Sequence, residues 1–174
     1  IFNDDTYELA REDANTPDGF LKRRLKPLVG THASTIAYSV IEGDAPVYDS
    51  KVQPIFGDAH GGPSPYWGEI TGNIKALSAS GYCPLQLVTD LAHDNGMESF
   101  ASLRMNDVHD AHPPGSRRWT YGLAKFKQDH PEYMFGTIED WDQESGPKQL
   151  WSGLDFAIPE VRDHVFAIIE EVAE

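Results

Sequence analysis

The residues that could do chemistry are densest in one run, 104–112. Its polar members are Arg104, Asn106, Asp107, His109, Asp110 and His112. A guanidinium can clamp a carboxylate or sulfate, and carboxylates, amides and imidazoles can hydrogen-bond sugar hydroxyls. Paired carboxyl groups also serve as the acid and the nucleophile or base of glycoside hydrolysis. The run therefore predicts a sugar pocket, with Asp107 and Asp110 as candidate catalytic acids and with Arg104, Asn106 and His109 as substrate-binding residues.

The same run leaves a metal site open as an alternative. Asp107, His109, Asp110 and His112 carry carboxylate and imidazole groups, which suit zinc, manganese or iron. No full ligand signature such as H-E-x-x-H is present, so we predict neither a metal nor another cofactor. A structural role, in which these residues cap the loop and pair with each other, is a further alternative.

Other candidate ligand contacts are spread along the chain. Asp4 and Asp5 follow an apolar start, and they could bind substrate or orient Arg104; loop capping is the alternative. His60 lies beside two glycines that let the backbone approach a ligand closely. Four tryptophans fall in or beside long loops, where an aromatic face can stack on a pyranose or instead cover the core. The predicted substrate-binding set is completed by Asp4, Asp5, Tyr38, His60, Trp141 and Trp151.

Strands and helices must position these side chains, and hydrophobic patterning predicts where they lie. Short apolar or β-branched runs predict strands at 1–5, 35–40 and 97–104. Helical spacing of apolar residues predicts helices at 17–28, 70–81, 84–96 and 159–174, the first capped by Thr16. The segments 41–66 and 105–152 read as long loops, apart from a short helix near 121–128.

The alternation of strands and helices predicts an α/β fold with a parallel sheet, which right-handed crossovers would either close as a barrel or leave doubly wound. We interpret residues 1–174 as the N-terminal part of a single (β/α)8 TIM-barrel type catalytic domain, holding about the first three βα units. In such a barrel the strand C-termini carry the active site, which would bring Asp4 and Asp5 beside the run 104–112. The last helix runs into three glutamates without a cap, so we expect the native chain to continue and the remainder of the barrel or a partner chain to be required.

Composition narrows the classes of partner. Hydrophobic residues make up 40% and charged residues 24% of the chain, as in ordinary globular domains. The net charge of -14 argues against nucleic acid and anionic membrane, which need clustered Lys and Arg. No apolar run approaches the length of a membrane span, and Cys83 alone cannot form an intrachain disulfide.

Two segments carry a resemblance to a known family. Residues 102–110, Ser-Leu-Arg-Met-Asn-Asp-Val-His-Asp, and residues 154–165 resemble a bacterial glycoside-hydrolase-like (β/α) barrel family, distantly related to amylase-type barrel glycosidases. The resemblance implies hydrolysis of a poly- or oligosaccharide by a secreted or periplasmic enzyme. It also implies an acidic strand after the segment 159–174, so the main catalytic acids could lie beyond Glu174. A metal-dependent hydrolase on the same scaffold and a non-catalytic carbohydrate-binding protein are the alternatives.

Overall fold

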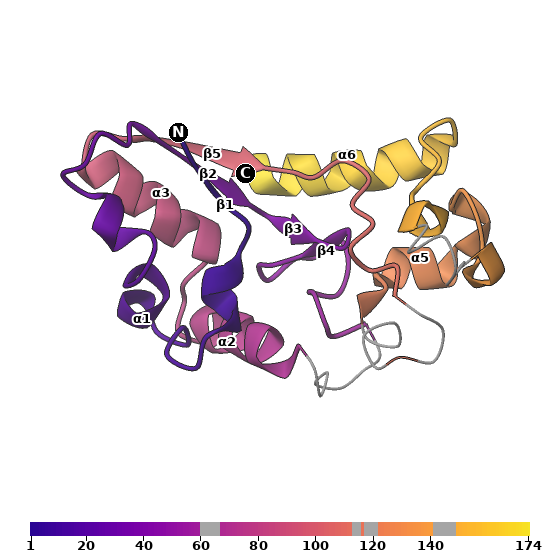
Figure 1. The fold of residues 1–174 in the computed structure, drawn as a ribbon, viewed down its shortest axis with the longest axis horizontal. Coiled ribbons are helices and arrows are strands. Elements are labelled where there is room, and N and C mark those ends of the chain that lie inside the picture. The colour runs from indigo at the N-terminus through magenta and orange to yellow at the C-terminus, as the bar shows by residue number, and fades with distance from the viewer. Residues whose placement is uncertain (60–66, 113–115, 117–121, 141–148) are drawn as a thin grey trace.

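A three-stranded parallel sheet organises the computed structural model, which describes residues 1–59, 67–112, 116, 122–140 and 149–174 (Figure 1). The strands are β1 (Phe2–Asp4), β2 (Thr35–Ser39) and β5 (Glu98–Ser102), in the order β1-β2-β5. Ile36 lies opposite both Phe2 and Ser99 in the register. The three predicted strands are therefore confirmed. Because the described sheet has three strands, a (β/α)8 barrel remains a prediction.

The described part of the chain contains five α-helices. They are α1 (Pro17–Leu21), α2 (Gly68–Ala79), α3 (Pro84–Asp94), α5 (Lys125–Asp129) and α6 (Pro159–Ala173). Short 3₁₀ helices span Tyr7–Ala10, Lys26–Leu28, Pro131–Tyr133, Ile138–Asp140 and Gln149–Ser152. The predicted cap is present, since the Thr16 hydroxyl accepts a hydrogen bond from the Gly19 N–H at 3.2 Å. The predicted helix 17–28 is observed as two pieces, α1 and the 3₁₀ helix Lys26–Leu28, and Pro27 lies at the start of the second piece, where its missing N–H is not needed.

A small antiparallel hairpin follows β2, where sequence patterning predicted only loop. Its strands are β3 (Ile41–Glu42) and β4 (Ala45–Pro46). Gly43 and Asp44 form the connecting turn with φ of 54° and 62°, the left-handed geometry that a type I′ turn requires at both positions. The hairpin places Glu42 and Asp44 at the C-terminal edge of the main sheet.

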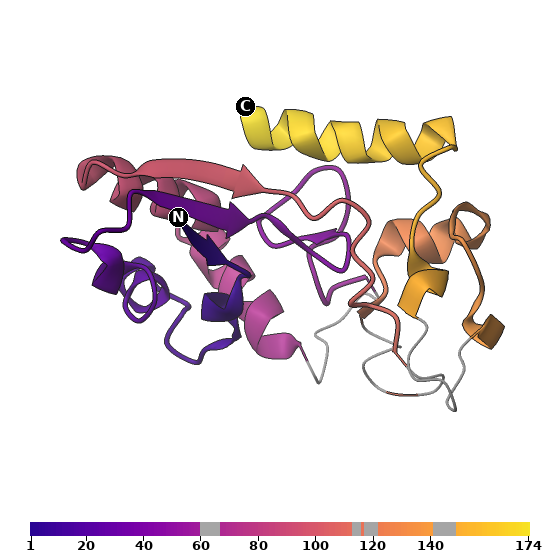
Figure 2. The same ribbon diagram turned by 45° about the horizontal axis from the view of Figure 1, so that its top comes forward.

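The core lies between the sheet and the helices α1 and α3. Ile36 and Tyr38 are buried on this side, and the Phe20 ring of α1 meets the Tyr38 ring edge-on with centroids 6.1 Å apart. Thr89 of α3 lies 3.1 Å from Ser99 of β5 through their hydroxyl oxygens. On the other side of the sheet the Phe100 side chain is 56% exposed. The helices therefore cover one face of the sheet, with α6 beside the end of β5 (Figure 2).

The carboxylate-rich end of α6 is held by the loop after β4. Glu171 accepts hydrogen bonds from Tyr48 Oη at 2.9 Å, Ser50 Oγ at 2.5 Å and the Lys51 N–H at 2.6 Å. These donors offset the unfavourable interaction of a carboxylate with the helix dipole. The sequence pattern alone could not reveal them, because they lie 120 or more positions away.

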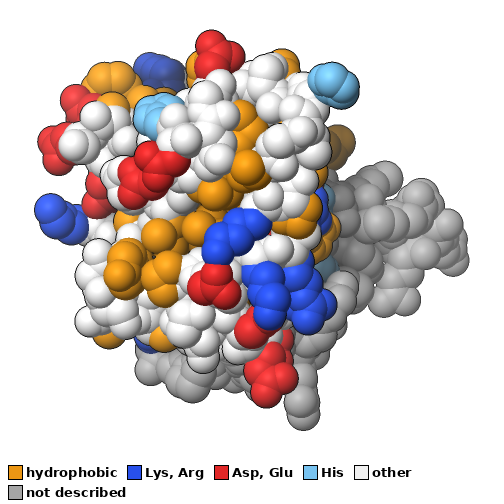
Figure 3. Space-filling view, turned by 90° about the vertical axis from the view of Figure 1, so that its left-hand side faces the viewer, with side chains coloured by type: hydrophobic (Ala, Val, Ile, Leu, Met, Phe, Trp, Pro, Cys, Tyr) orange, Lys and Arg blue, Asp and Glu red, His pale blue; other side chains and the backbone are white. Residues whose placement is uncertain are grey.

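The surface at the end where the strands begin mixes both signs of charge. Figure 3 shows this end, with a band of hydrophobic side chains among separate Lys, Arg, Asp and Glu groups. Within the described ranges, no helix combines the length and apolarity needed to cross a bilayer.

Two buried carboxylates share one guanidinium beneath β1. Arg24 Nε lies 3.5 Å from Asp4 Oδ2 and 3.3 Å from Glu8 Oε1. Both acids are fully buried, and burial raises the pKa of each. A raised pKa in the folded state means that folding is favoured by the protonated acid and weakened as pH rises past the unfolded pKa.

Replacing Glu8 with glutamine is therefore expected to raise the melting temperature near neutral pH. The gain should shrink on acidification to about pH 3, where Glu8 is protonated in both the folded and the unfolded state because the ordinary pKa of glutamate is 4.5. Thermal melts at the two pH values test this, with the exposed Glu12→Gln as the control. A lower melting temperature for Glu8→Gln at neutral pH would mean that its attraction to Arg24 outweighs the cost of burial.

Candidate functional site

A cavity of about 360 Å³ opens at the C-terminal edge of the sheet. Asp5 follows β1, Glu42 belongs to the hairpin after β2, and His109 follows β5. The cavity lining consists of Asp5, Thr6, Tyr7, Ala10, Glu42, Gly43, Phe56, Trp67, Ile70, His109, Asp110, His112 and Gly122. Ligands of parallel α/β sheets bind at this edge, and the volume falls within the range of small-molecule pockets.

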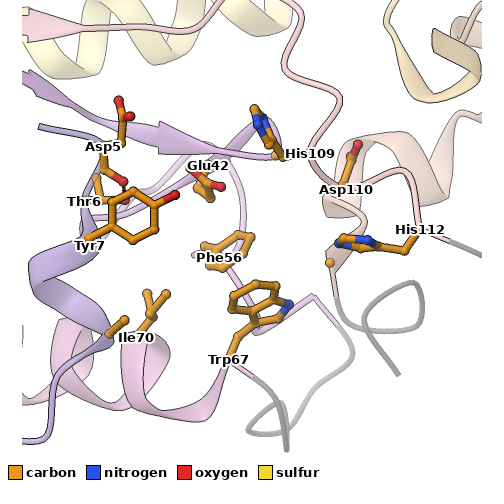
Figure 4. A pocket seen from close by; sticks show the side chains of 13 residues that line it. Asp5, Thr6, Tyr7, Glu42, Phe56, Trp67, Ile70, His109, Asp110 and His112 are labelled. Atoms are coloured by element: carbon orange, nitrogen blue, oxygen red, sulfur yellow. Dashed lines mark hydrogen bonds between the residues drawn. The ribbon is translucent and has the colours of Figure 1, made fainter. Parts of the chain in front are cut away.

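One wall of the cavity is aromatic and apolar (Figure 4). The other, the polar wall, carries Asp5, Glu42, His109 and Asp110. Phe56 and Trp67 pack with ring centroids 5.2 Å apart, and Tyr7 and Ile70 extend the aromatic wall. An aromatic wall suits the apolar face of a sugar ring. The sequence marked Trp67 as a candidate for stacking on a sugar but not Tyr7 or Phe56, because these two occupy short segments without a recognisable period.

Arg104 connects the acids of the polar wall. Its Nη2 lies 2.7 Å from Asp5 Oδ1, and its Nη1 lies 3.5 Å from Glu42 Oε2 and 3.6 Å from Asp107 Oδ2. Asp5 therefore orients Arg104, which is one of the two roles predicted for it from the sequence. Asp4 contacts Arg24 instead. Three protein carboxylates thus surround this guanidinium.

The environments of Glu42 and Asp107 shift their pKa values in opposite directions. Burial, and then the charge of Asp107, raises the pKa of Glu42 above its usual value. Burial acts on Asp107 in the same sense, but hydrogen bonds from the N–H groups of His109 at 3.0 Å and Gly43 at 3.1 Å, with the His109 ring, lower its pKa overall. Such a separation is typical of an acid beside an ionised carboxylate.

Asp107 also holds the imidazole of His109. Its Oδ1 lies 2.5 Å from His109 Nδ1. The His109 side chain is 62% exposed and lines the cavity, whereas the Asp107 side chain is 1% exposed. A buried carboxylate that orients an accessible imidazole can place that ring for hydrogen bonding or proton transfer. In this geometry Asp107 orients His109, and its own catalytic role remains a prediction.

Asp110, the second acid proposed for catalysis from the sequence, is engaged inside the protein. Its Oδ2 lies 2.8 Å from Lys127 Nζ, and its Oδ1 accepts a hydrogen bond from Ser152 Oγ at 2.8 Å. Burial raises its pKa to about 7. Asp110 contributes to the cavity lining while its two carboxylate oxygens contact these partners, and its catalytic role remains a prediction.

The remaining predicted ligand contacts separate from the cavity. Tyr38 is buried because strand alternation directs it to the helix-covered face, and Trp151 is 4% exposed. Asn106 Oδ1 accepts a hydrogen bond from the Leu154 N–H at 2.5 Å. None of these three lines the cavity, and Tyr38 and Trp151 are buried in the part of the chain that the structure describes. His60 and Trp141 lie outside the described residues.

The alternative of a metal site finds a different set of ligands. Among the described residues, Glu42, Asp107 and His109 bring one potential ligand atom each within 4.8 Å of one another. Asp110 and His112, which the sequence suggested, are not in this group. Arg104 Nη1 already faces the carboxylates of Glu42 and Asp107, which weakens the attraction of the same oxygens for a metal cation.

Comparison with known proteins identifies distant relatives. The chain is 29% identical over 140 residues to proteins named glycosyl hydrolase DigH in Escherichia coli strain K12 and in Shigella flexneri. The match covers 80% of this chain, and the chain spans about a quarter (27%) of the length of these relatives. No protein-family model matches the chain. The similarity supports a glycoside-hydrolase-like relationship and leaves the amylase-type barrel a prediction.

Proposed function

We propose that this chain carries the sugar pocket of a glycoside hydrolase. The observation that supports it best is the convergence of Asp5 and Glu42 on opposite nitrogens of Arg104, beside an aromatic wall. This arrangement lies at the sheet edge where ligands of parallel α/β folds bind. The distant similarity to proteins named glycosyl hydrolase is consistent with it.

In the proposed reaction Glu42 is the general acid. Its raised pKa favours the protonated form, which donates its proton to the glycosidic oxygen as the bond from that oxygen to the anomeric carbon breaks. Asp5, held by Arg104, faces the developing positive charge as nucleophile or as base for water. If Asp5 is the nucleophile, it bonds to the anomeric carbon, and water then displaces it while giving a proton to Glu42. If Asp5 is the base, it takes the proton of the attacking water, and proton exchange with solvent restores both the Asp5 carboxylate and the Glu42 acid.

The other groups would bind and orient the sugar. Tyr7 and Trp67 provide surfaces for the apolar face of the ring, and His109 provides a hydrogen-bonding group for a hydroxyl. Because Asp107 fixes the His109 ring, that contact would have a defined direction.

The wider setting of the enzyme is also part of the proposal. A poly- or oligosaccharide substrate and a secreted or periplasmic location follow from the family resemblance. The acidic composition is compatible with both. A (β/α)8 barrel completed by further chain or by a partner would be consistent with the greater length of the relatives.

The direct test is release of reducing ends from a panel of polysaccharides. We expect the protein to release soluble sugar, and we expect this release to continue after a chelator has removed metal ions. Binding without release would instead favour a non-catalytic carbohydrate-binding protein. Release that a chelator abolishes and zinc or manganese restores would favour the metal-dependent alternative.

A further inference from the structure

Lys127 is a charged side chain buried completely behind the cavity. From helix α5 its Nζ reaches Asp44 Oδ2 at 2.6 Å, Asp110 Oδ2 at 2.8 Å and the main-chain oxygen of Asp107 at 2.8 Å. Taking an ammonium out of water is unfavourable unless such partners surround it. Here the partners come from two loops that are more than 60 residues apart in sequence.

The two loops held by Lys127 also contact each other directly. The Gly43 N–H donates to Asp107 Oδ2 at 3.1 Å, and the Asp107 N–H donates to Asp44 Oδ1 at 3.3 Å. A Cβ on Gly43 would lie only 3.2 Å from Asp110 Cβ, so the turn and the loop pack closely. Lys127 therefore lies beneath a junction whose two sides cannot shift independently.

Each side of this junction carries a group of the polar wall. Glu42 immediately precedes the Gly43 turn, and His109 is fixed by Asp107. We propose that Lys127 is a positioning residue that sets the placement of Glu42 relative to His109 across the cavity. The proposal rests on the function proposed above, because it assigns Lys127 to the geometry of that site. Lys127 itself is inaccessible to a ligand.

The test compares Lys127→Met with Lys125→Met on the same helix. Lys125 is 40% exposed and pairs with Asp129, so its loss removes a lysine without touching the junction. We expect Lys127→Met to lower kcat about 100-fold with a smaller change in KM, since small misplacements of catalytic groups have effects of this size. Lys125→Met should behave like the wild type. Equal kcat values for both variants and the wild type would overturn the proposal.

A second readout is independent of turnover. Hydrogen exchange of the Gly43 amide reports its bond to Asp107, and the His109 ring resonances report its contact with the same residue. Lys127→Met should accelerate Gly43 exchange and move the His109 signals, whereas Lys125→Met should not. If the wild type releases no sugar, the glycosidase proposal fails, while these signals still decide whether Lys127 positions the junction.

A double variant covers the case in which Lys127→Met does not fold. Lys127→Met/Asp44→Asn removes an ion pair as a unit, and the amide oxygen introduced by Asp44→Asn can still accept from the Asp107 N–H. Asp110, with a pKa of about 7, can take up a proton. Faster Gly43 exchange in the folded double variant supports the proposal, and wild-type exchange contradicts it.

Discussion

Replacing Glu42 with glutamine is expected to lower kcat by about 10²–10⁴-fold, the usual contribution of general acid catalysis. Glutamine has nearly the same shape and can still contact Arg104 through its oxygen, but it has no acidic proton to give a leaving group. Burial, and then the charge of Asp107, raises the pKa of Glu42. Burial also raises the pKa of Asp110, but that carboxylate is bound by Lys127 and Ser152. Initial rates of reducing-end release measure the effect, with the exposed Glu160→Gln on α6 as the control.

The pH profile distinguishes acid catalysis from simple loss of structure. Because Glu42 acts in its protonated form, kcat/KM should fall as pH rises through its pKa. Asp107→Asn removes a negative charge that raises this pKa, so the alkaline limb should move to lower pH. Wild-type turnover by Glu42→Gln, or an alkaline limb that does not move, would exclude Glu42 as the acid.

The sheet edge at which the cavity lies could be predicted from the sequence, but the residues that line the cavity could not. The polar run 104–112 follows a recognisable strand, and parallel strands bring their C-terminal ends together. That logic placed Asp5 near Arg104 correctly. Within the run, however, the chain has no regular period, so no pattern indicates which acids face the cavity. Tertiary partners decide it: Lys127 engages Asp110, and His109 engages Asp107.

The hairpin shows a second physical limit. β3 and β4 are each two residues long, too short for apolar and polar residues to alternate detectably. Their remaining signal is the Gly43–Asp44 pair, a combination that suits a type I′ turn. This hairpin presents Glu42 to the cavity. Because the sequence predicts only a loop there, Glu42 is not among the residues that the sequence suggests for the site.

Replacing Gly19 with alanine is expected to destabilise the fold by about 3 kcal/mol or more. A Cβ at this position would lie 1.7 Å from the main-chain oxygen of Asp13, and 3.1 Å from Thr16 Oγ1. The loop before α1 would have to move. This movement is unfavourable because the main-chain oxygen of Arg11 in that loop accepts a hydrogen bond from Asn73 Nδ2 at 2.6 Å. The next residue, Phe20, would lose its packing against the core.

The matched control is Gly72→Ala in the interior of α2. An added Cβ there meets no neighbouring atom within 4 Å, and alanine favours a helix over glycine by about 1 kcal/mol. Urea denaturation followed by circular dichroism should therefore shift the midpoint down for Gly19→Ala and up for Gly72→Ala. A Gly19→Ala midpoint equal to that of the wild type would show that the loop before α1 can move away from the added Cβ without loss of stability.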